Sequence, residues 1–155
     1  MSQLRLLEMR LKPLDTPGPL FYKRFMNIHG SPLSSTLLRD TDVADRFWYW
    51  SGRSGRRYIH SVYALATCPP LPGAVYIAVR RNGGVPVAVA LGRFPAILDQ
   101  PGIDRLRRRL SALGASELHV HLLSRSDSEA EAARSDLAAA IDPQWRDLSI
   151  VSLAA

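Results

Sequence analysis

The chain has 155 residues, of which 46% are hydrophobic and 22% charged, and its net charge is +6. This is the length of one globular domain, and the sequence has neither the ~18 unbroken apolar residues of a membrane helix nor the apolar segment of a secretory signal. We therefore expect a single cytoplasmic domain over residues 1–155 with no membrane partner, in which the lone Cys68 is a buried thiol without a disulfide partner.

The N-terminal part of the chain contains little regular pattern. Apolar residues alternate over Leu7, Met9 and Leu11, which predicts a strand that is ended by Pro13 and by TPGP at residues 16–19. Residues 13–45 are interpreted as an irregular, proline-containing arm, with a short helix at most over residues 34–47. This arm either folds back on the domain or waits for a partner.

The segment RFWYWSGRSGRRYIHSVY, at residues 46–63, predicts a β-hairpin with a turn of glycine, serine and arginine. Side chains alternate across a strand, so Phe47 and Tyr49 face one way while Trp48 and Trp50 face the other. Large aromatic side chains are usually buried, so at least one of these pairs should belong to the core. The hairpin is either a nucleic-acid reader or a structural unit whose arginines are only its solvated tip.

A second hairpin follows the rigid connector CPPLPG. Its first strand places Val75, Ile77 and Val79 on one face, and NGG at residues 82–84 predicts the turn. The return strand is expected to place one set of apolar residues on a single face: Val85, Val87, Val89 and Leu91. Its opposite face holds only small residues, which are Pro86, Ala88, Ala90 and Gly92. Such a face predicts that a bulky element, a helix, packs closely against it.

The remaining elements are a helix, a strand and a second helix. Residues 99–115 predict an amphipathic helix that ends at Gly114. Its expected buried residues are Ile103, Leu106, Leu110 and Leu113. Residues 117–123 predict a strand with Leu118, Val120 and Leu122 inward and with Glu117, His119 and His121 outward.

Ser126 or Asp127 caps a helix that continues to Ile141, and Glu129 stands three positions after Ser126 as in a capping box. A short strand is expected at residues 148–153. The chain is thus predicted to be an α+β domain. Its mainly antiparallel sheet combines two β-hairpins with one further strand, and two helices pack on it to complete a ββαβα core.

Over residues 73–141 the sequence contains GAVYI, a turn, ALGRF, the helix RLRRRL, the strand HVHLL and a helix with two glutamates. This order resembles the GIY-YIG nuclease domain. The resemblance implies a metal-dependent endonuclease, and Tyr76 matches its first motif tyrosine. Ala74 replaces the first glycine, and Ala90 replaces the second tyrosine. Loss of that hydroxyl at the point of proton transfer implies a catalytically degenerate relative.

The same resemblance implies the remaining site residues. Arg105 or Arg107 would be the helix arginine beside Tyr76, and Glu129 or Glu131 would be the metal carboxylate. Mg²⁺ would be the metal, because it often takes only one or two protein oxygens plus waters and phosphates. No other cofactor is expected. The alternative is that both glutamates are capping and surface acids near a positive helix N-terminus.

Two histidines on one strand offer a different metal site. His119 and His121 share a face, a spacing found in some zinc sites, and the third ligand would be His60, His29 or a distant acid. The alternative is that both are ordinary residues on the solvated side of an amphipathic strand.

Positive charge is concentrated in the middle of the chain, where residues 51–110 contain ten arginines and two aspartates. The arginines expected to bind nucleic acid are Arg53, Arg56, Arg57, Arg80, Arg81, Arg108 and Arg109. Such a distribution favours DNA or RNA as a partner, or else forms a solvated basic face. The competing hypothesis is a non-catalytic accessory module that binds a protein through the Trp48–Trp50 hairpin and the proline-rich arm.

Overall fold

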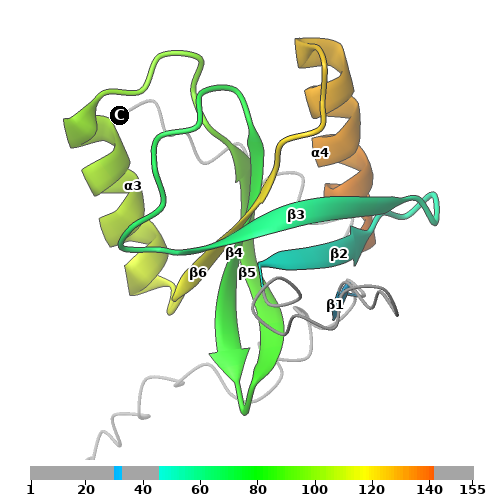
Figure 1. Cartoon of the computed structure of the whole chain (residues 1–155), viewed down its shortest axis with the longest axis horizontal. Helices are drawn as coiled ribbons and strands as arrows, with labels where there is room; N and C mark the ends of the chain where they lie inside the picture. The colour runs from blue at the N-terminus through cyan, green and yellow to red at the C-terminus, as the bar shows by residue number, and fades with distance from the viewer. Residues whose placement is uncertain (1–29, 33–45, 142–155) are drawn as a thin grey trace, which may run out of the picture.

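The computed structural model describes residues 30–32 and 46–141, which form one antiparallel sheet and two helices (Figure 1). The strands are β1 (Gly30–Pro32), β2 (Phe47–Ser51), β3 (Arg57–Ala64), β4 (Val75–Asn82), β5 (Val85–Arg93) and β6 (Glu117–His121). The helices are α3 (Gln100–Ala112) and α4 (Asp127–Ile141). The predicted α+β class and the ββαβα order of the later elements are confirmed.

Strand β6 joins the two hairpins into one sheet. The strand order is β1-β2-β3-β6-β4-β5, and each neighbouring pair runs antiparallel. Val120 of β6 therefore lies opposite Ser61 of β3 on one side and Tyr76 of β4 on the other. Both ladders of this central strand are filled, so its backbone groups are paired without solvent.

Strand β1 corrects one expectation, because Gly30–Pro32 belongs to the segment predicted to be irregular. It pairs with β2, with Gly30 opposite Trp50. A Cβ atom at Gly30 would lie 2.2 Å from the Trp48 Nε1 atom, so only glycine permits this close approach. Most other predictions for the two ends of the chain lie outside the described residues. These are the rest of the arm over residues 13–45, most of the short helix predicted at 34–47, and the strands predicted before Pro13 and at 148–153.

The two helices cover opposite faces of the sheet, as Figure 1 shows. The core under α4 contains Trp50, Tyr58, Val75, Ile77, Val79, Ala88, Leu91, Ala130, Ala133, Leu137, Ala138 and Ile141. The core under α3 contains Leu65, Cys68, Tyr76, Ala78, Val89, Phe94, Ile103, Leu106, Leu110, Ala115, Leu118 and Val120. The sheet is thus the middle layer of three, and neither described helix is long and apolar enough to cross a membrane.

A β-bulge changes the predicted faces of β5. The register shifts opposite Ala78 and Val79, so that Val89 is the extra residue between Ala88 and Ala90. Val89 therefore packs with the α3 core, whereas Ala88 packs with the α4 core, and the uniform alternation predicted for β5 is wrong. The small residues of β5 were expected to lie under a helix. At Gly92 the close neighbour is instead the side chain of Tyr76, because a Cβ at Gly92 would lie 2.5 Å from Tyr76 Oη.

The opening hairpin divides its aromatic residues between the two faces, as predicted. Trp50 is 1% exposed in the α4 core, and Trp48 packs against that core. Phe47 and Tyr49, which alternate with the tryptophans, lie half-buried on the opposite face. The tryptophans are therefore core residues.

The tip of this hairpin is fastened to α4 by Asp136. Its carboxylate accepts hydrogen bonds from Ser54 N at 2.8 Å, from Ser54 Oγ at 2.6 Å and from Tyr58 Oη at 2.9 Å. Gly52 permits this contact, because a Cβ there would lie 2.0 Å from the Asp136 Oδ2 atom. The turn is consequently anchored to α4.

Both helices are capped by the residues that begin or end them. Asp99 Oδ1 accepts from Gly102 N at 2.7 Å, and Gly114 ends α3 with a φ of 83°. Leu113, which was predicted to be buried, is 55% exposed because the helix has ended before it. At α4 the cap is Ser126, whose Oγ accepts from Glu129 N at 3.2 Å.

Replacing Asp136 with alanine should destabilise the fold. The change removes the acceptor for three donors, so we expect the free energy of unfolding to fall by about 1–3 kcal/mol in urea denaturation. Glu131→Ala is the matched control on the same helix, because its ion pair with Arg134 is at the surface and should contribute less than about 1 kcal/mol. Equal stability of Asp136→Ala and the wild type would contradict this role for the carboxylate.

Candidate functional site

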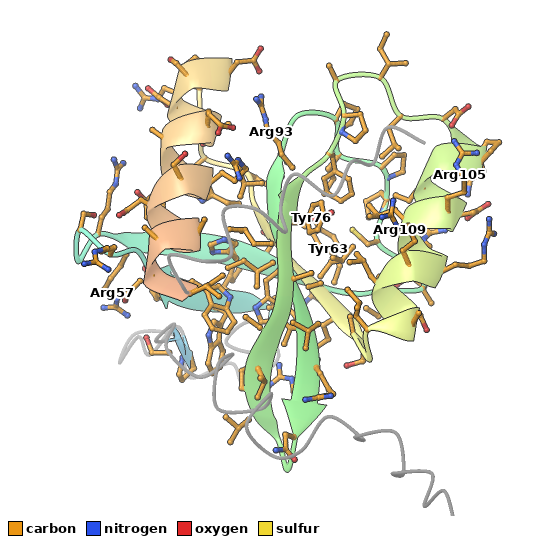
Figure 2. The ribbon with its side chains drawn as sticks, turned by 180° about the vertical axis from the view of Figure 1, so that it is seen from behind. Arg57, Tyr63, Tyr76, Arg93, Arg105 and Arg109 are labelled. Carbon is orange, nitrogen blue, oxygen red and sulfur yellow. The ribbon has the colours of Figure 1, made fainter. Side chains whose placement is uncertain are left out.

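Tyr76, the residue that matches the first motif tyrosine, lies inside the molecule. Its side chain is 3% exposed and packs beside Phe94, with ring centroids 4.9 Å apart. Burial raises the pKa of Tyr76 to about 12, although the charge of Arg109 acts in the opposite direction. In Figure 2, Tyr76 and Tyr63 extend from the sheet toward α3. The phenol is thus held in its neutral form.

The arginines of α3 divide into two kinds. Arg107 is half-buried, and its Nη atoms donate to Cys68 O at 2.6 Å and to Asp104 Oδ1 at 3.1 Å. It therefore ties the helix to the connector that precedes β4. The exposed residues Arg105, Arg108 and Arg109 lie three and four positions apart, opposite the buried face of the helix. Figure 2 shows Arg105 and Arg109 on this helix.

The two candidate metal carboxylates lie on α4, across the sheet from the Tyr76 side chain. Glu129 Oε2 accepts from Arg125 N at 2.7 Å, which completes the capping box with Ser126. Glu131 pairs with Arg134, with a 3.0 Å bond from Arg134 Nε. The structure thus brings Tyr76 near Arg109 but does not bring either glutamate to them.

The histidines predicted to face outward are buried. His119 is 0% exposed and His121 is 8% exposed. The Trp48 and Trp50 rings lie against His119, and the Tyr58 ring lies against His121. Both ring nitrogens of His119 already have protein partners. Within residues 30–32 and 46–141, no three histidine, cysteine or acidic side chains are placed to hold a metal ion.

A chain of hydrogen bonds runs from Trp50 in the core to Arg81 near the surface. Trp50 Nε1 donates to His119 Nδ1 at 3.0 Å, and His119 Nε2 donates to Glu117 Oε2 at 3.0 Å. Arg81 Nε then donates to both Glu117 oxygens, at 2.9 and 3.1 Å. The indole N–H fixes the tautomer of His119, since Nδ1 can accept only when it carries no proton. Sequence periodicity gave no signal for this network.

The electrostatics of this network favour neutral histidine and ionised glutamate. Burial lowers the pKa of His119, and the hydrogen bond from His119 together with Arg81 lowers the pKa of Glu117 to about 2. Burial also lowers the pKa of His60 to about 3. His60 Nδ1 donates to Tyr58 O at 2.9 Å, and its Nε2 atom has no partner within the described part of the chain.

The three predicted groups of arginines do not form one continuous patch. Arg80 lies 3.5 Å from the position that a Cβ of Gly114 would take, so it adjoins the end of α3. The hairpin tip with Arg53 and Arg56 lies at the opposite side of the molecule from α3 in Figure 1. Arg81 is held by Glu117 and by Gly84 O at 3.0 Å. We define the helix patch as Arg80, Arg105, Arg108 and Arg109.

The lone cysteine is the buried thiol that the sequence predicts. Cys68 is 0% exposed, and burial raises its pKa to about 11. A neutral, inaccessible thiol is a poor nucleophile and a poor metal ligand. Cys68 therefore contributes to the α3 core rather than to a site.

Comparison with protein-family models, with curated proteins and with solved structures gave no significant match to this chain.

The stability of the fold should fall as the pH drops. The pKa values of His60 and His119 are lower in the folded chain than in the unfolded chain, so below about pH 6.5 the unfolded chain binds protons that the folded chain does not. The stability that these neutral histidines contribute is therefore fully present above about pH 6.5 and is lost as the pH falls, toward about pH 3 for His60. Glu117 acts in the same direction from pH 4.5 toward about 2. We expect urea denaturation to show a progressive decrease in the free energy of unfolding between pH 7 and pH 4.

His60→Gln tests the origin of this dependence, because glutamine does not titrate. One histidine that is protonated only in the unfolded chain contributes a slope of about 1.4 kcal/mol per pH unit. The variant should lose about that slope between pH 6 and pH 4. A pH profile parallel to that of the wild type would show that His60 is not the titrating group.

Proposed function

We propose that this protein binds DNA or RNA through the helix patch. The observation that carries the proposal is the exposed face of α3, on which Arg105, Arg108 and Arg109 follow at helical spacing. Arg105 and Arg108 form no hydrogen bond or ion pair with the described residues, so their charges are available to phosphates. Phosphate contacts by arginine release counterions and supply most of the affinity of non-specific binding.

The geometry favours binding without cleavage. The Tyr76 phenol is buried, and its raised pKa leaves almost none of it as phenolate at neutral pH, so it has no charged oxygen with which to accept a proton. Glu129 and Glu131 are engaged on α4, which packs on the other face of the sheet. These placements support a catalytically degenerate relative of the GIY-YIG nucleases over an active one.

The alternative of a protein-docking module has weaker support. Of the three rings in its Trp48–Trp50 hairpin, Trp48 and Trp50 point into the α4 core, Trp50 is almost fully buried, and only Tyr49 lies half-buried on the opposite face. Buried rings do not form the exposed anchors that interfaces use. The proline-rich arm, the second part of that hypothesis, lies mostly outside the described residues.

The binding proposal predicts a steep dependence on salt. We expect the affinity for a fluorescent oligonucleotide to fall as the salt concentration rises from 50 to 200 mM. In the double variant Arg105→Gln/Arg108→Gln, the plot of log K against log salt concentration should be less steep by about 1.5. Arg125→Gln is a matched control, because this exposed arginine precedes α4. Absence of binding at low salt, or equal slopes for wild type and double variant, would contradict the proposal.

Cleavage provides a separate test. We expect plasmid DNA and labelled RNA to remain intact with Mg²⁺ or Mn²⁺, because the tyrosine and the carboxylates are not gathered at one point. Metal-dependent cleavage that disappears in Tyr76→Phe and in Glu129→Ala or Glu131→Ala would overturn the non-catalytic interpretation. Cleavage that survives all three substitutions would indicate a contaminating nuclease.

A further inference from the structure

A second surface lies on the face of β2 and β3 that points away from the tryptophans. The register puts Tyr49 opposite Ile59 and Phe47 opposite Ser61. Side chains alternate along β3, so Arg57 and Tyr63 lie on this same face. We call Phe47, Tyr49, Arg57, Ile59 and Tyr63 the aromatic face.

Neither described helix covers most of the aromatic face. The core under α3 is built from β4, β5 and β6, and from the β2–β3 hairpin only Tyr63 packs against it. The other helix, α4, lies on the reverse side with the tryptophans. Figure 1 shows the hairpin extending away from α3, toward the side of the molecule on which α4 lies. Its rings are half-buried.

The chemistry of this face suits an anion that carries rings. The described residues of β1, β2 and β3 on this side include no acid, being Ser31, Phe47, Tyr49, Ser51, Arg57, Ile59, Ser61 and Tyr63. The Arg57 guanidinium stacks over the Tyr49 ring at 4.3 Å, and its Nη2 atom donates to Ser31 Oγ at 2.9 Å. The cation is therefore held in place at the aromatic surface before any ligand arrives.

Single-stranded nucleic acid has the complementary features. Its unpaired bases stack on aromatic rings and on guanidinium planes, while its phosphates pair with arginine. A duplex keeps its bases stacked inside and cannot offer them to a sheet. Tyr63 adjoins the α3 core, so the face leads from Arg57 toward the helix patch, and Figure 2 shows Arg57 and α3 on opposite sides of Tyr63.

We propose that the aromatic face binds single-stranded nucleic acid, with bases stacked on the Phe47 ring and on the Arg57 guanidinium that lies over Tyr49. This inference rests on the proposed function, because it assigns the class of nucleic acid that the helix patch attracts. In this arrangement the β2–β3 hairpin contacts the bases, and α3 contacts phosphates further along the nucleic acid.

The test compares three 12-nucleotide probes on the wild-type protein by fluorescence anisotropy: oligothymidylate, an abasic strand with the same phosphates, and a matched duplex. Stacking contributes ~1–3 kcal/mol per base, which corresponds to about a 5- to 150-fold change in Kd. Oligothymidylate should bind tighter than the abasic strand by at least that lower factor, and tighter than the duplex. Equal affinity for the thymidylate and abasic strands, or preference for the duplex, would overturn the inference.

Variants locate the contact. Tyr49→Leu and Phe47→Leu should each weaken thymidylate binding about 5-fold or more and leave the abasic strand unaffected, and Tyr49→Phe should recover most of the loss. Ile97→Ala removes a 91% exposed side chain elsewhere and should change nothing. If the leucine variants bind as the wild type does, another part of the chain covers the face and the inference fails, while the helix patch proposal stands. Absence of binding to every probe would overturn both.

Discussion

The burial of β6 on both faces is the constraint on which the structure depends. This strand joins the two hairpins, and both of its faces are covered, by the α3 core on one side and by aromatic rings of the α4 core on the other. On one side the buried residues Leu118 and Val120 are apolar and need no polar partner. On the other side the buried rings of His119 and His121 need hydrogen-bond partners. Trp50 and Glu117 supply them for His119. The tryptophans are consequently committed to the core, and the hairpin turns its other rings outward.

Much of the fold can be read from the sequence because its signals are local. Alternation, the NGG turn, the helical spacing of Ile103, Leu106 and Leu110, and the Ser126 capping box each predict an element that the structure contains. What alternation cannot tell is which face of a strand is covered, so the histidines of β6 were assigned to solvent. Nor does it reveal the bulge at Val89, because Val85, Val87, Val89 and Leu91 continue an unbroken pattern.

The candidate site was less predictable, because an arginine's role depends on its partners in space. Arg81 and Arg107 stand beside other arginines in the sequence and look no different from them there, yet one is held by Glu117 and the other by a backbone carbonyl of Cys68. For Glu129 the sequence did offer a structural role as an alternative to the catalytic one, because the capping-box spacing from Ser126 predicts it. The resemblance to a nuclease rests on the order of residue types along the sequence, whereas catalysis requires those residues to lie close together in space.

The bulge at Val89 has a consequence for the outer border of the sheet. Among the described strands β5 is an edge, and a regular edge offers a row of unpaired N–H and C=O groups to any passing chain. The extra residue breaks the spacing of that row and increases the local twist. A regular ladder with another strand would be interrupted at this point, and such an interruption is one of the ways in which sheet edges discourage pairing with a further chain.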